Sequence, residues 1–220
     1  MVSCLISAYH AEPFILKRLV NLRGHERIVV CQDGSREEAV ARFQKAEVVI
    51  TTPDIPTIGK AWNLAYHAAT QKYVTTANTD DSFYTGALDT CADILDRYKK
   101  VGLVFGRVDK ANGGGGHVVI WDRITEDTGV FMDTRKIYKR CIVGPMPVWR
   151  RSWLDKIGGF DEDFIVAADW EYWLRMLDAG TQIYYVNEPV GLYAKRDDSL
   201  EWRNKNKLGK EQKRIREMHP

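Results

Sequence analysis

The sequence has no run of about 20 apolar residues, which is the length that a membrane-spanning helix needs. Its first ten residues are apolar but lack a basic leader, so we expect neither a signal peptide nor a membrane anchor. The 32 lysines and arginines nearly balance the 30 aspartates and glutamates, so the chain lacks the strong positive bias typical of dedicated nucleic-acid-binding proteins. These absences predict a cytoplasmic protein whose contact with membranes, if any, is peripheral.

Cysteine is scarce, and the four cysteines lie far apart in the sequence: Cys4, Cys31, Cys91 and Cys141. No CxxC pair is present, which excludes zinc knuckles and thioredoxin-like redox motifs and suits reduced thiols in the cytoplasm. The four glycines at 113–116 lack both the Lys-Ser/Thr ending of a P-loop and the spacing of a dinucleotide fingerprint. We therefore expect that segment to be a hinge or lid loop and not a phosphate cradle.

The first half of the chain alternates short β-branched runs with helix-length amphipathic segments. We predict strands at residues 2–7, 27–32, 47–51, 73–77 and 101–105, and helices at 14–22, 36–45, 59–70 and 87–98. This alternation is typical of βαβ units around a mainly parallel sheet. The second half is less regular. We expect strands there at 117–121 and 142–149, in a different sheet region, and at 182–186 and 191–195, with helices at 152–157 and 169–179.

A chain of 220 residues with 45% hydrophobic content fits one domain. We predict a single domain over residues 1–199, with halves at 1–106 and 107–199, followed by a basic, helical tail at 200–220. Residues 195–219 contain nine lysines and arginines against five aspartates and glutamates, an excess of four positive charges. This segment could bind anionic lipid or nucleic-acid phosphates, or could form a solvated amphipathic helix.

Polar residues follow three of the predicted strands at the point where each strand ends. They are Tyr9, Asp33 and the run of residues 78–81, Asn-Thr-Asp-Asp. Because ligands bind beyond the carboxyl ends of the strands in such sheets, we expect these residues to converge. Asp33 could accept hydrogen bonds from a nucleobase or ribose, with Gly34 forming the turn and Ser35 capping the next helix. An ordinary surface turn is the alternative for these three residues.

Acidic residues stand at two further points. Asp80 and Asp81 are adjacent, and neighbouring carboxylates repel each other unless a cation offsets them. Mg²⁺ or Mn²⁺ bound by one or two carboxylates and the phosphates of a substrate is the usual solution, although Asp80 could instead cap a helix. Asp169 begins a predicted helix, where an isolated aspartate is most often an N-cap or a partner of the helix dipole.

Six ordered stretches resemble glycosyltransferase family 2, the inverting enzymes with the GT-A nucleotide-diphospho-sugar fold. They are residues 5–10, 28–35, 59–63, 78–81, 156–162 and 168–175, and residues 193–199 also fit the family pattern. The resemblance implies a three-layer α/β/α GT-A fold with a Rossmann-like, mainly parallel sheet and a less regular acceptor-binding half. It covers nearly the whole chain except the tail.

The resemblance also implies which residues bind the donor, a nucleotide-sugar for which a UDP-sugar is the first candidate. Tyr9 and Asp33 resemble the residues that hold the donor's base. Asn63 and Asn78 fall where the family approaches the base, the ribose or the sugar. Lys195 and Arg196 lie where the family often places basic residues near the diphosphate, and they could close over it or remain a solvated surface pair.

The chemistry implied by the resemblance depends on three carboxylates. Asp80, with Asp81 beside it, resembles the metal-binding end of the family's DxD motif and would bind Mn²⁺ or Mg²⁺. Asp169 resembles the catalytic base, which takes the proton of the attacking hydroxyl while the cation offsets charge on the leaving nucleoside diphosphate. Asn78 departs from the pattern, since the family has a first aspartate there, and this leaves one carboxylate fewer for a metal.

The acceptor is the least constrained part of the sequence. Trp149 and Trp170 are the aromatic candidates for contacting it, although Trp170 also lies at helical spacing from Trp173 and Leu174, which is typical of a core face. As the acceptor, we rank a glycan or glycolipid first. A modified base in nucleic acid, whose phosphates the basic tail would bind, ranks second. A nucleotidyltransferase and a degenerate, non-catalytic nucleotide- or glycan-binding module are the alternatives to a glycosyltransferase.

Overall fold

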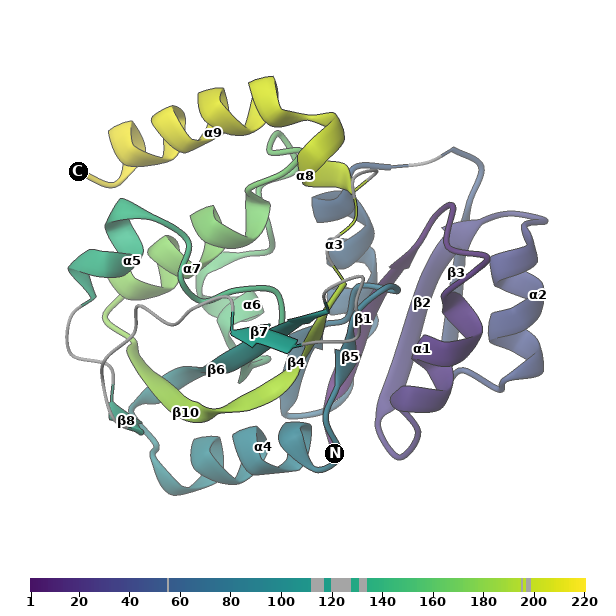
Figure 1. Cartoon of the computed structure of the whole chain (residues 1–220), viewed down its shortest axis with the longest axis horizontal. Helices are drawn as coiled ribbons and strands as arrows, with labels where there is room; N and C mark the ends of the chain where they lie inside the picture. The colour runs from purple at the N-terminus through teal and green to yellow at the C-terminus, as the bar shows by residue number, and fades with distance from the viewer. Residues whose placement is uncertain (55, 112–116, 120–127, 131–133, 195, 197–198) are drawn as a thin grey trace.

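The computed structural model describes residues 1–220 except 55, 112–116, 120–127, 131–133, 195 and 197–198 (Figure 1). The predicted glycine loop and Lys195 therefore lie outside the described residues. In chain order the strands are β1 (Ser3–Ala8), β2 (Glu26–Gln32), β3 (Val48–Thr52), β4 (Tyr73–Thr76), β5 (Ser82–Phe83), β6 (Val101–Ala111), β7 (His117–Val119), β8 (Gly129–Val130), β9 (Val148–Arg150) and β10 (Gln182–Tyr193). The helices are α1 (Ile15–Asn21), α2 (Arg36–Phe43), α3 (Ile58–Ala68), α4 (Ala87–Arg97), α5 (Arg135–Lys139), α6 (Trp153–Ile157), α7 (Ala168–Asp178), α8 (Leu200–Arg203) and α9 (Lys205–Met218).

These strands form a ten-stranded sheet with the order β3-β2-β1-β4-β9-β6-β10-β5, in which β7 pairs with β6 and β8 with β10. Strands β3, β2, β1 and β4 run parallel to one another, as do β6 and β10. Strand β9 is antiparallel to both of its neighbours. The parallel block brings the carboxyl ends of β1, β2 and β4 to the same edge, as the alternating pattern predicts.

Side chains on successive residues of the central strands enter two different cores. On β1, Leu5 contributes to one hydrophobic cluster while Cys4 and Ile6 contribute to the other. Helices α1, α2 and α4 pack on the side of Cys4 and Ile6, and α3, α6 and α7 pack on the side of Leu5 (Figure 1). Strands buried on both faces read as continuous apolar runs, which explains the sequence pattern and confirms the three-layer α/β/α architecture.

The second half of the chain differs from its prediction. Strand β9 lies between β4 and β6 in the same sheet and not in a separate sheet region. Of the strand predicted at 142–149, only the last two residues lie in β9. Pro145 and Pro147 have no backbone N–H to donate to a ladder, and Gly144 has a positive φ of 76°. The two strands predicted at 182–186 and 191–195 form one long strand, β10, with register shifts along β6 between Val186 and Gly191.

Helices α8 and α9 pack onto the α3 and α7 side of the molecule (Figure 1). On α9, Ile215 is fully buried within the hydrophobic cluster that contains Trp170 and Trp173. The predicted tail is therefore an integral part of the packed domain. Within the described residues, no helix combines the length and the apolar character needed to cross a membrane.

Candidate active site

Residues that follow β1 and β2 meet at the end of β3. The hydroxyl of Tyr9 lies 2.7 Å from the Oγ1 atom of Thr52, the last residue of β3. The backbone N–H of Asp33 donates to the carbonyl of the same Thr52 at 3.0 Å, and the Asp33 side chain is exposed. Tyr9 and Asp33 thus lie beside each other at the carboxyl edge of the sheet, where the sequence predicts them.

The turn after Asp33 has the conformation that its sequence predicts. Gly34 has a positive φ of 69°, a region that glycine adopts without steric cost. Ser35 is the N-cap of α2, and its Oγ atom accepts from the N–H of Glu38 at 3.2 Å. Glu38 in return accepts from the N–H of Gly34 at 2.9 Å, so the turn and the helix start are fixed together.

A cleft of about 410 Å³ opens beside this turn. Its lining comes from the end of β1, the loop after it, the end of β2 and the start of α2: Ala8, Tyr9, His10, Glu12, Pro13, Gln32, Ser35, Arg36 and Glu37. Residues from two neighbouring strand ends therefore enclose a volume that suits a small ligand.

The turn after β4 is organised around a buried carboxylate. Asp81 is 4% exposed, and its two oxygens accept from the backbone N–H of Ala194 at 3.0 Å and from Nδ2 of Asn78 at 3.2 Å. Burial raises the pKa of Asp81 to about 7, and the neighbouring charge of Asp80 adds to the increase. The bond to Ala194 attaches this turn to the segment that follows β10, which is 113 residues later in the chain.

Arg18, a residue that the sequence analysis does not identify, lies buried on α1 near these carboxylates. Its Nη1 donates to Oδ1 of Asn21 at 2.8 Å, while its Nε and Nη2 atoms have no hydrogen-bond partner among the described residues. Burial lowers the pKa of Arg18, and the charges of Asp81 and Asp80 partly offset that decrease. The signal in the sequence is the place of Arg18 on the apolar face formed by Ile15, Leu19 and Leu22.

Asp80 points toward the basic segment after β10. Its Oδ2 lies 3.6 Å from Nη1 of Arg196, and the guanidinium of Arg196 is 4.3 Å from the centre of the Phe14 ring. The predicted proximity of a basic residue to the acidic turn is therefore present at Arg196. Lys195, its predicted companion, lies outside the described residues.

Asp169 stands in the first turn of α7 and is half-buried. Its Oδ1 accepts from the backbone N–H of Trp170 at 2.7 Å. Burial raises the pKa of Asp169 to about 6, and the charges of Glu201 and Glu211 act in the same direction. A carboxylate with a raised pKa at the start of a helix is a suitable proton acceptor near neutral pH.

Glu201 on α8 connects the two acidic regions electrostatically. Its charge contributes to the raised pKa of Asp169 and also to that of Tyr193. Burial raises the pKa of Tyr193 to about 12, with further contributions from Asp81, Glu201 and Asp80 in that order. The charge of Glu201 thus acts on Asp169 and on Tyr193, whose pKa is also raised by the charges of Asp81 and Asp80.

The side chains available as metal ligands near the acidic turn are compatible with a cation that is bound mainly by the phosphates of a substrate. No group of three or more histidine, cysteine, aspartate or glutamate side chains is arranged to hold a metal in the part of the chain that the structure describes. Both oxygens of Asp81 already accept hydrogen bonds, so Asp80 is the better placed of the two carboxylates. One carboxylate plus phosphate oxygens and water is an ordinary set of ligands for Mg²⁺ or Mn²⁺.

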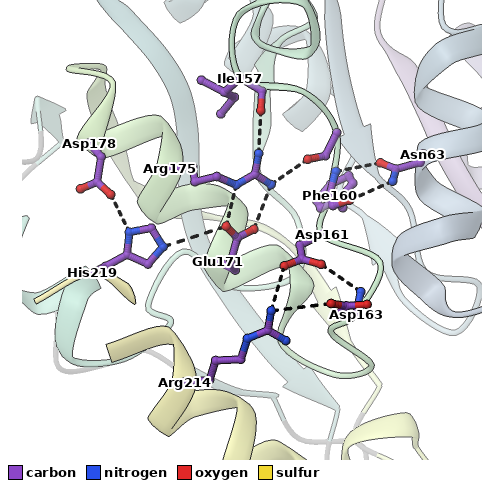
Figure 2. Close-up of polar contacts among 11 residues, drawn as sticks. Asn63, Ile157, Phe160, Asp161, Asp163, Glu171, Arg175, Asp178, Arg214 and His219 are labelled. Carbon is purple, nitrogen blue, oxygen red and sulfur yellow. Dashed lines mark hydrogen bonds and ion pairs between the residues drawn. The ribbon is translucent and has the colours of Figure 1, made fainter. Parts of the chain in front are cut away.

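Asn63 has a structural role that differs from the predicted contact with the donor. Its Nδ2 donates to the carbonyl of Phe160 at 2.9 Å, and its Oδ1 accepts from the N–H of Phe160 at 2.7 Å (Figure 2). Its Nδ2 also donates to Oε1 of Glu162 at 2.9 Å. A Cβ atom on Gly159 would come within 2.3 Å of this Oδ1, so glycine is required for the close approach. Asn63 therefore joins α3 to the loop before α7.

The prediction that Trp149 and Trp170 contact the acceptor is wrong. Their exposed fractions are 0% and 1%, and their indole N–H groups donate to the Tyr66 hydroxyl at 2.9 Å and to the Ile137 carbonyl at 2.7 Å. Both belong to the hydrophobic cluster on the α3 and α7 side of the sheet. Large aromatic rings with satisfied N–H groups are core residues here, because packing against α3, α5 and α9 leaves them no solvent-facing surface.

A different tryptophan lines a second cavity, of about 280 Å³, beside the acidic turn. Trp202 on α8 is 47% exposed, and the cavity wall also contains residues of β6, of the end of β10, of the segment that follows it, of α8 and of α9: Lys110, Tyr193, Arg196, Ser199, Glu201 and Lys205. Trp202 is thus half-exposed close to Arg196 and Glu201, and Nζ of Lys205 lies over its ring, 2.9 Å from the ring centre. A lone tryptophan in a charged segment has no periodic or motif signal, so Trp202 is not among the predicted site residues.

Comparisons with known proteins identify the family of the chain and its fold. The family model described as glycosyltransferase-like family 2 matches residues 2–215. The crystal structure of S. aureus TarS 1–349 in complex with UDP-GlcNAc is similar, with a TM-score of 0.75 and 18% identity over 90% of this chain and 60% of that chain. The UDP complex of the same fragment gives 0.72 and 18% over 90% and 61%.

A further S. aureus TarS structure aligns with a TM-score of 0.71 and 18% identity over 90% of this chain and 37% of that chain. The chain thus spans about three fifths, or less, of the length of the TarS chains that it matches. No curated protein sequence matches the chain. At 18% identity, the likeness to TarS shows a common fold.

Proposed function

Because the chain belongs to glycosyltransferase-like family 2 and has the GT-A fold, we propose that it is an inverting, metal-dependent glycosyltransferase that uses a UDP-sugar. The observation that carries this proposal is the convergence of two halves of the chain at one sheet edge. The turn containing Asp80 and Asp81 is bonded to the residue that follows β10, and the charge of Glu201 on α8 raises the pKa both of Tyr193, at the end of β10, and of Asp169. The two TarS complexes, with UDP-GlcNAc and with UDP, support a uridine nucleotide as the first candidate.

In the proposed reaction, the Asp169 carboxylate accepts the proton of an acceptor hydroxyl as its oxygen attacks the anomeric carbon of the donor sugar. The bond between that carbon and the diphosphate oxygen breaks, and the electron pair leaves with the nucleoside diphosphate. Attack from the side opposite the leaving group inverts the configuration at the anomeric carbon. Tyr9 and Asp33 hold the base of the donor, and Arg196 attracts its diphosphate.

We assign the cation to Asp80. Mn²⁺ or Mg²⁺ bound there with the diphosphate would neutralise the negative charge that develops on the leaving group. Asp81 holds the turn in shape through Ala194 and Asn78, which explains how asparagine can replace an acidic residue at position 78. In this arrangement Asn78 donates to a carboxylate, a contact that a second ionised carboxylate at this position could not make.

We propose a glycan or glycolipid as the acceptor. The half-exposed ring of Trp202, with Nζ of Lys205 over one of its faces, borders the cavity beside Arg196 and Glu201 and supports a saccharide, because aromatic rings pack against sugar rings. Trp202 takes the place that the sequence analysis gives to Trp149 and Trp170.

The proposed donor class can be tested by calorimetry with UDP, GDP, dTDP and CMP, each with and without Mn²⁺. We expect UDP to bind and its affinity to increase when Mn²⁺ is present, since the cation bridges Asp80 and the diphosphate. UDP-GlcNAc, incubated with the protein and candidate saccharides, should then release UDP. Absence of binding by every nucleotide would refute the transferase proposal and favour a degenerate module.

The raised pKa of Asp169 predicts how the activity depends on pH. The ionised carboxylate is the active form, so kcat/KM should fall as the pH decreases through about 6 and should approach a tenfold loss per pH unit below that value. The measurement is the rate of UDP release from UDP-GlcNAc between pH 4.5 and 8. An acid limb near pH 4, the ordinary range of an aspartate, would contradict the assignment of Asp169 as the base.

A further inference from the structure

In the helix that carries Asp169, the N-cap residue makes no side-chain cap hydrogen bond. That residue is Ala167, whose side chain has no atom that can accept a hydrogen bond. The first backbone N–H groups of a helix have no partner within the helix and need an acceptor from elsewhere. The position of Asp169 therefore depends on whatever orders the chain immediately before it.

A glutamate from the C-terminal helix binds the N-cap residue Ala167 and the two residues before it. Glu211 on α9 receives three consecutive backbone N–H groups: Ile165 donates to Oε1 at 2.8 Å, and Val166 and Ala167 donate to Oε2 at 3.0 and 2.9 Å. Convergence of successive amides on one anion is how proteins build anion-binding backbone sites. Hydrogen bonds to an ionised acceptor are about twice as strong as neutral ones, and a negative charge at a helix N-terminus also interacts favourably with the helix dipole.

Other contacts hold α9 against the same part of the molecule. Arg214 lies 3.6 Å from Asp161 and 3.7 Å from Asp163 in the loop before α7 (Figure 2). At the end of α9, Nδ1 of His219 lies 2.5 Å from Oδ2 of Asp178, the last residue of α7 (Figure 2). The helix is thus attached at both ends of α7, so Glu211 is held in one place relative to Asp169.

The loop before α7 is also fixed from the other side. Arg175 forms an ion pair with the buried Glu171 at 2.6 Å and donates to the carbonyls of Ile157 and Gly159 at 2.8 and 2.7 Å (Figure 2). Asn63 holds Phe160, as described above. Neither Arg175 nor Asn63 holds the end of the segment between residue 160 and the start of α7. Glu211 is the side chain that binds its last three amides.

We propose that Glu211 is a positioning residue for the transfer reaction, acting through the 165–167 backbone to set the place of the base Asp169. This inference rests on the proposed function in treating Asp169 as the base. The face of α9 that meets the domain carries Leu208, Glu211 and Ile215 at helical spacing, and Ile215 is fully buried. Glu211 lies in the middle of this buried face, where its carboxylate is satisfied by the three amides that it binds.

The test compares Glu211→Gln with Glu217→Gln, which removes the same charge from an exposed position on the same helix. Glutamine has one acceptor oxygen and an NH₂ group that would face the amides, so the cap is broken. We expect kcat for UDP release from UDP-GlcNAc to fall about 10- to 100-fold in Glu211→Gln, with KM changed less than threefold, because displacement of a catalytic group by about 1 Å can cost that much. Glu217→Gln should match the wild type.

A second readout separates positioning from stability. The pKa of Asp169, followed by the NMR shift of its carboxyl carbon, should be lower in Glu211→Gln than in the wild type or in Glu217→Gln, because the Glu211 charge contributes to its increase. Amide exchange in the wild type should be slower at 165–167 than at Glu162, which is exposed. This measurement needs no variant and still applies if Glu211→Gln fails to fold.

Fast exchange at 165–167 in the wild type would overturn the proposal, since the cap would then be absent in solution. An unchanged kcat in a folded Glu211→Gln protein, or an unchanged pKa of Asp169, would overturn it as well. If the wild type released no UDP, the proposed function would fail, whereas the exchange and titration measurements would still decide whether Glu211 caps α7 and acts on Asp169.

Discussion

Replacement of Asp169 with asparagine should lower kcat by about 10²- to 10⁴-fold, the usual contribution of a general base. Asparagine keeps the size of the side chain and an oxygen that can still accept from the Trp170 N–H, but it cannot take a proton. Binding of UDP in the presence of Mn²⁺ should stay within about twofold of the wild type, since Asp169 is not among the residues that line the cleft at Tyr9. The measurement is the rate of UDP release together with calorimetry.

Asp93→Asn is the matched control for this variant. Asp93 is exposed on α4, which covers the opposite face of the sheet from α7, so the same chemical change there should leave kcat and UDP affinity unaltered. A loss of less than about tenfold in Asp169→Asn would show that another group takes the proton. Glu201, which lies near Asp169 and Tyr193, would then be the next carboxylate to replace.

Replacement of Asp80 with asparagine should weaken Mn²⁺-dependent binding of UDP by about 100-fold, about 2.8 kcal/mol, because a cation then loses its carboxylate ligand. The ion pair between Asp80 and Arg196, 3.6 Å long and partly exposed, contributes little to folding, so the melting temperature should change by less than a few degrees. The measurement is calorimetry of UDP with and without Mn²⁺, and thermal denaturation.

Two outcomes would distinguish the roles of the acidic pair. Equal UDP affinity in wild type and Asp80→Asn, both with Mn²⁺, would contradict the assignment of the cation to Asp80. Asp81→Asn tests the other carboxylate. Because asparagine cannot accept two hydrogen bonds on two oxygens, we expect that variant to be damaged in stability, through the lost contacts to Ala194 and Asn78, more than in metal dependence.

The sequence alone predicts the scaffold and the edge at which the site lies. Apolar runs separated by amphipathic helices fix the parallel block, since side-chain alternation along β1 and β2 must fill two cores. The positions of Tyr9, Asp33 and the acidic turn follow, because residues directly after parallel strands share an edge. Local turn chemistry at Gly34 and Ser35 is also readable, since φ preference and helix capping depend on near neighbours in sequence.

The sequence could not show which of its polar and aromatic residues have a structural role and do not contact a ligand. The side-chain amide of Asn63 forms hydrogen bonds with Phe160 and Glu162, almost a hundred residues later in the chain. Trp149 and Trp170 are buried by elements from three parts of the chain. Such partners are decided when the layers pack. A residue that matches a family motif can therefore either bind a ligand or form a hydrogen bond within the core.

What the sequence determined by itself is the fold class, the succession of its first strands along the chain and the sheet edge at which Tyr9, Asp33 and the acidic turn gather, all of which depend on short-range pattern. What only the tertiary structure decided is the environment of each charged group: the burial of Arg18 and Asp81, the raised pKa of Asp169, and the cap that Glu211 forms on α7 from 44 to 46 residues away. The physical reason is that burial and long-range hydrogen bonding set the electrostatics of a site, and neither is encoded in the spacing of residues along the chain.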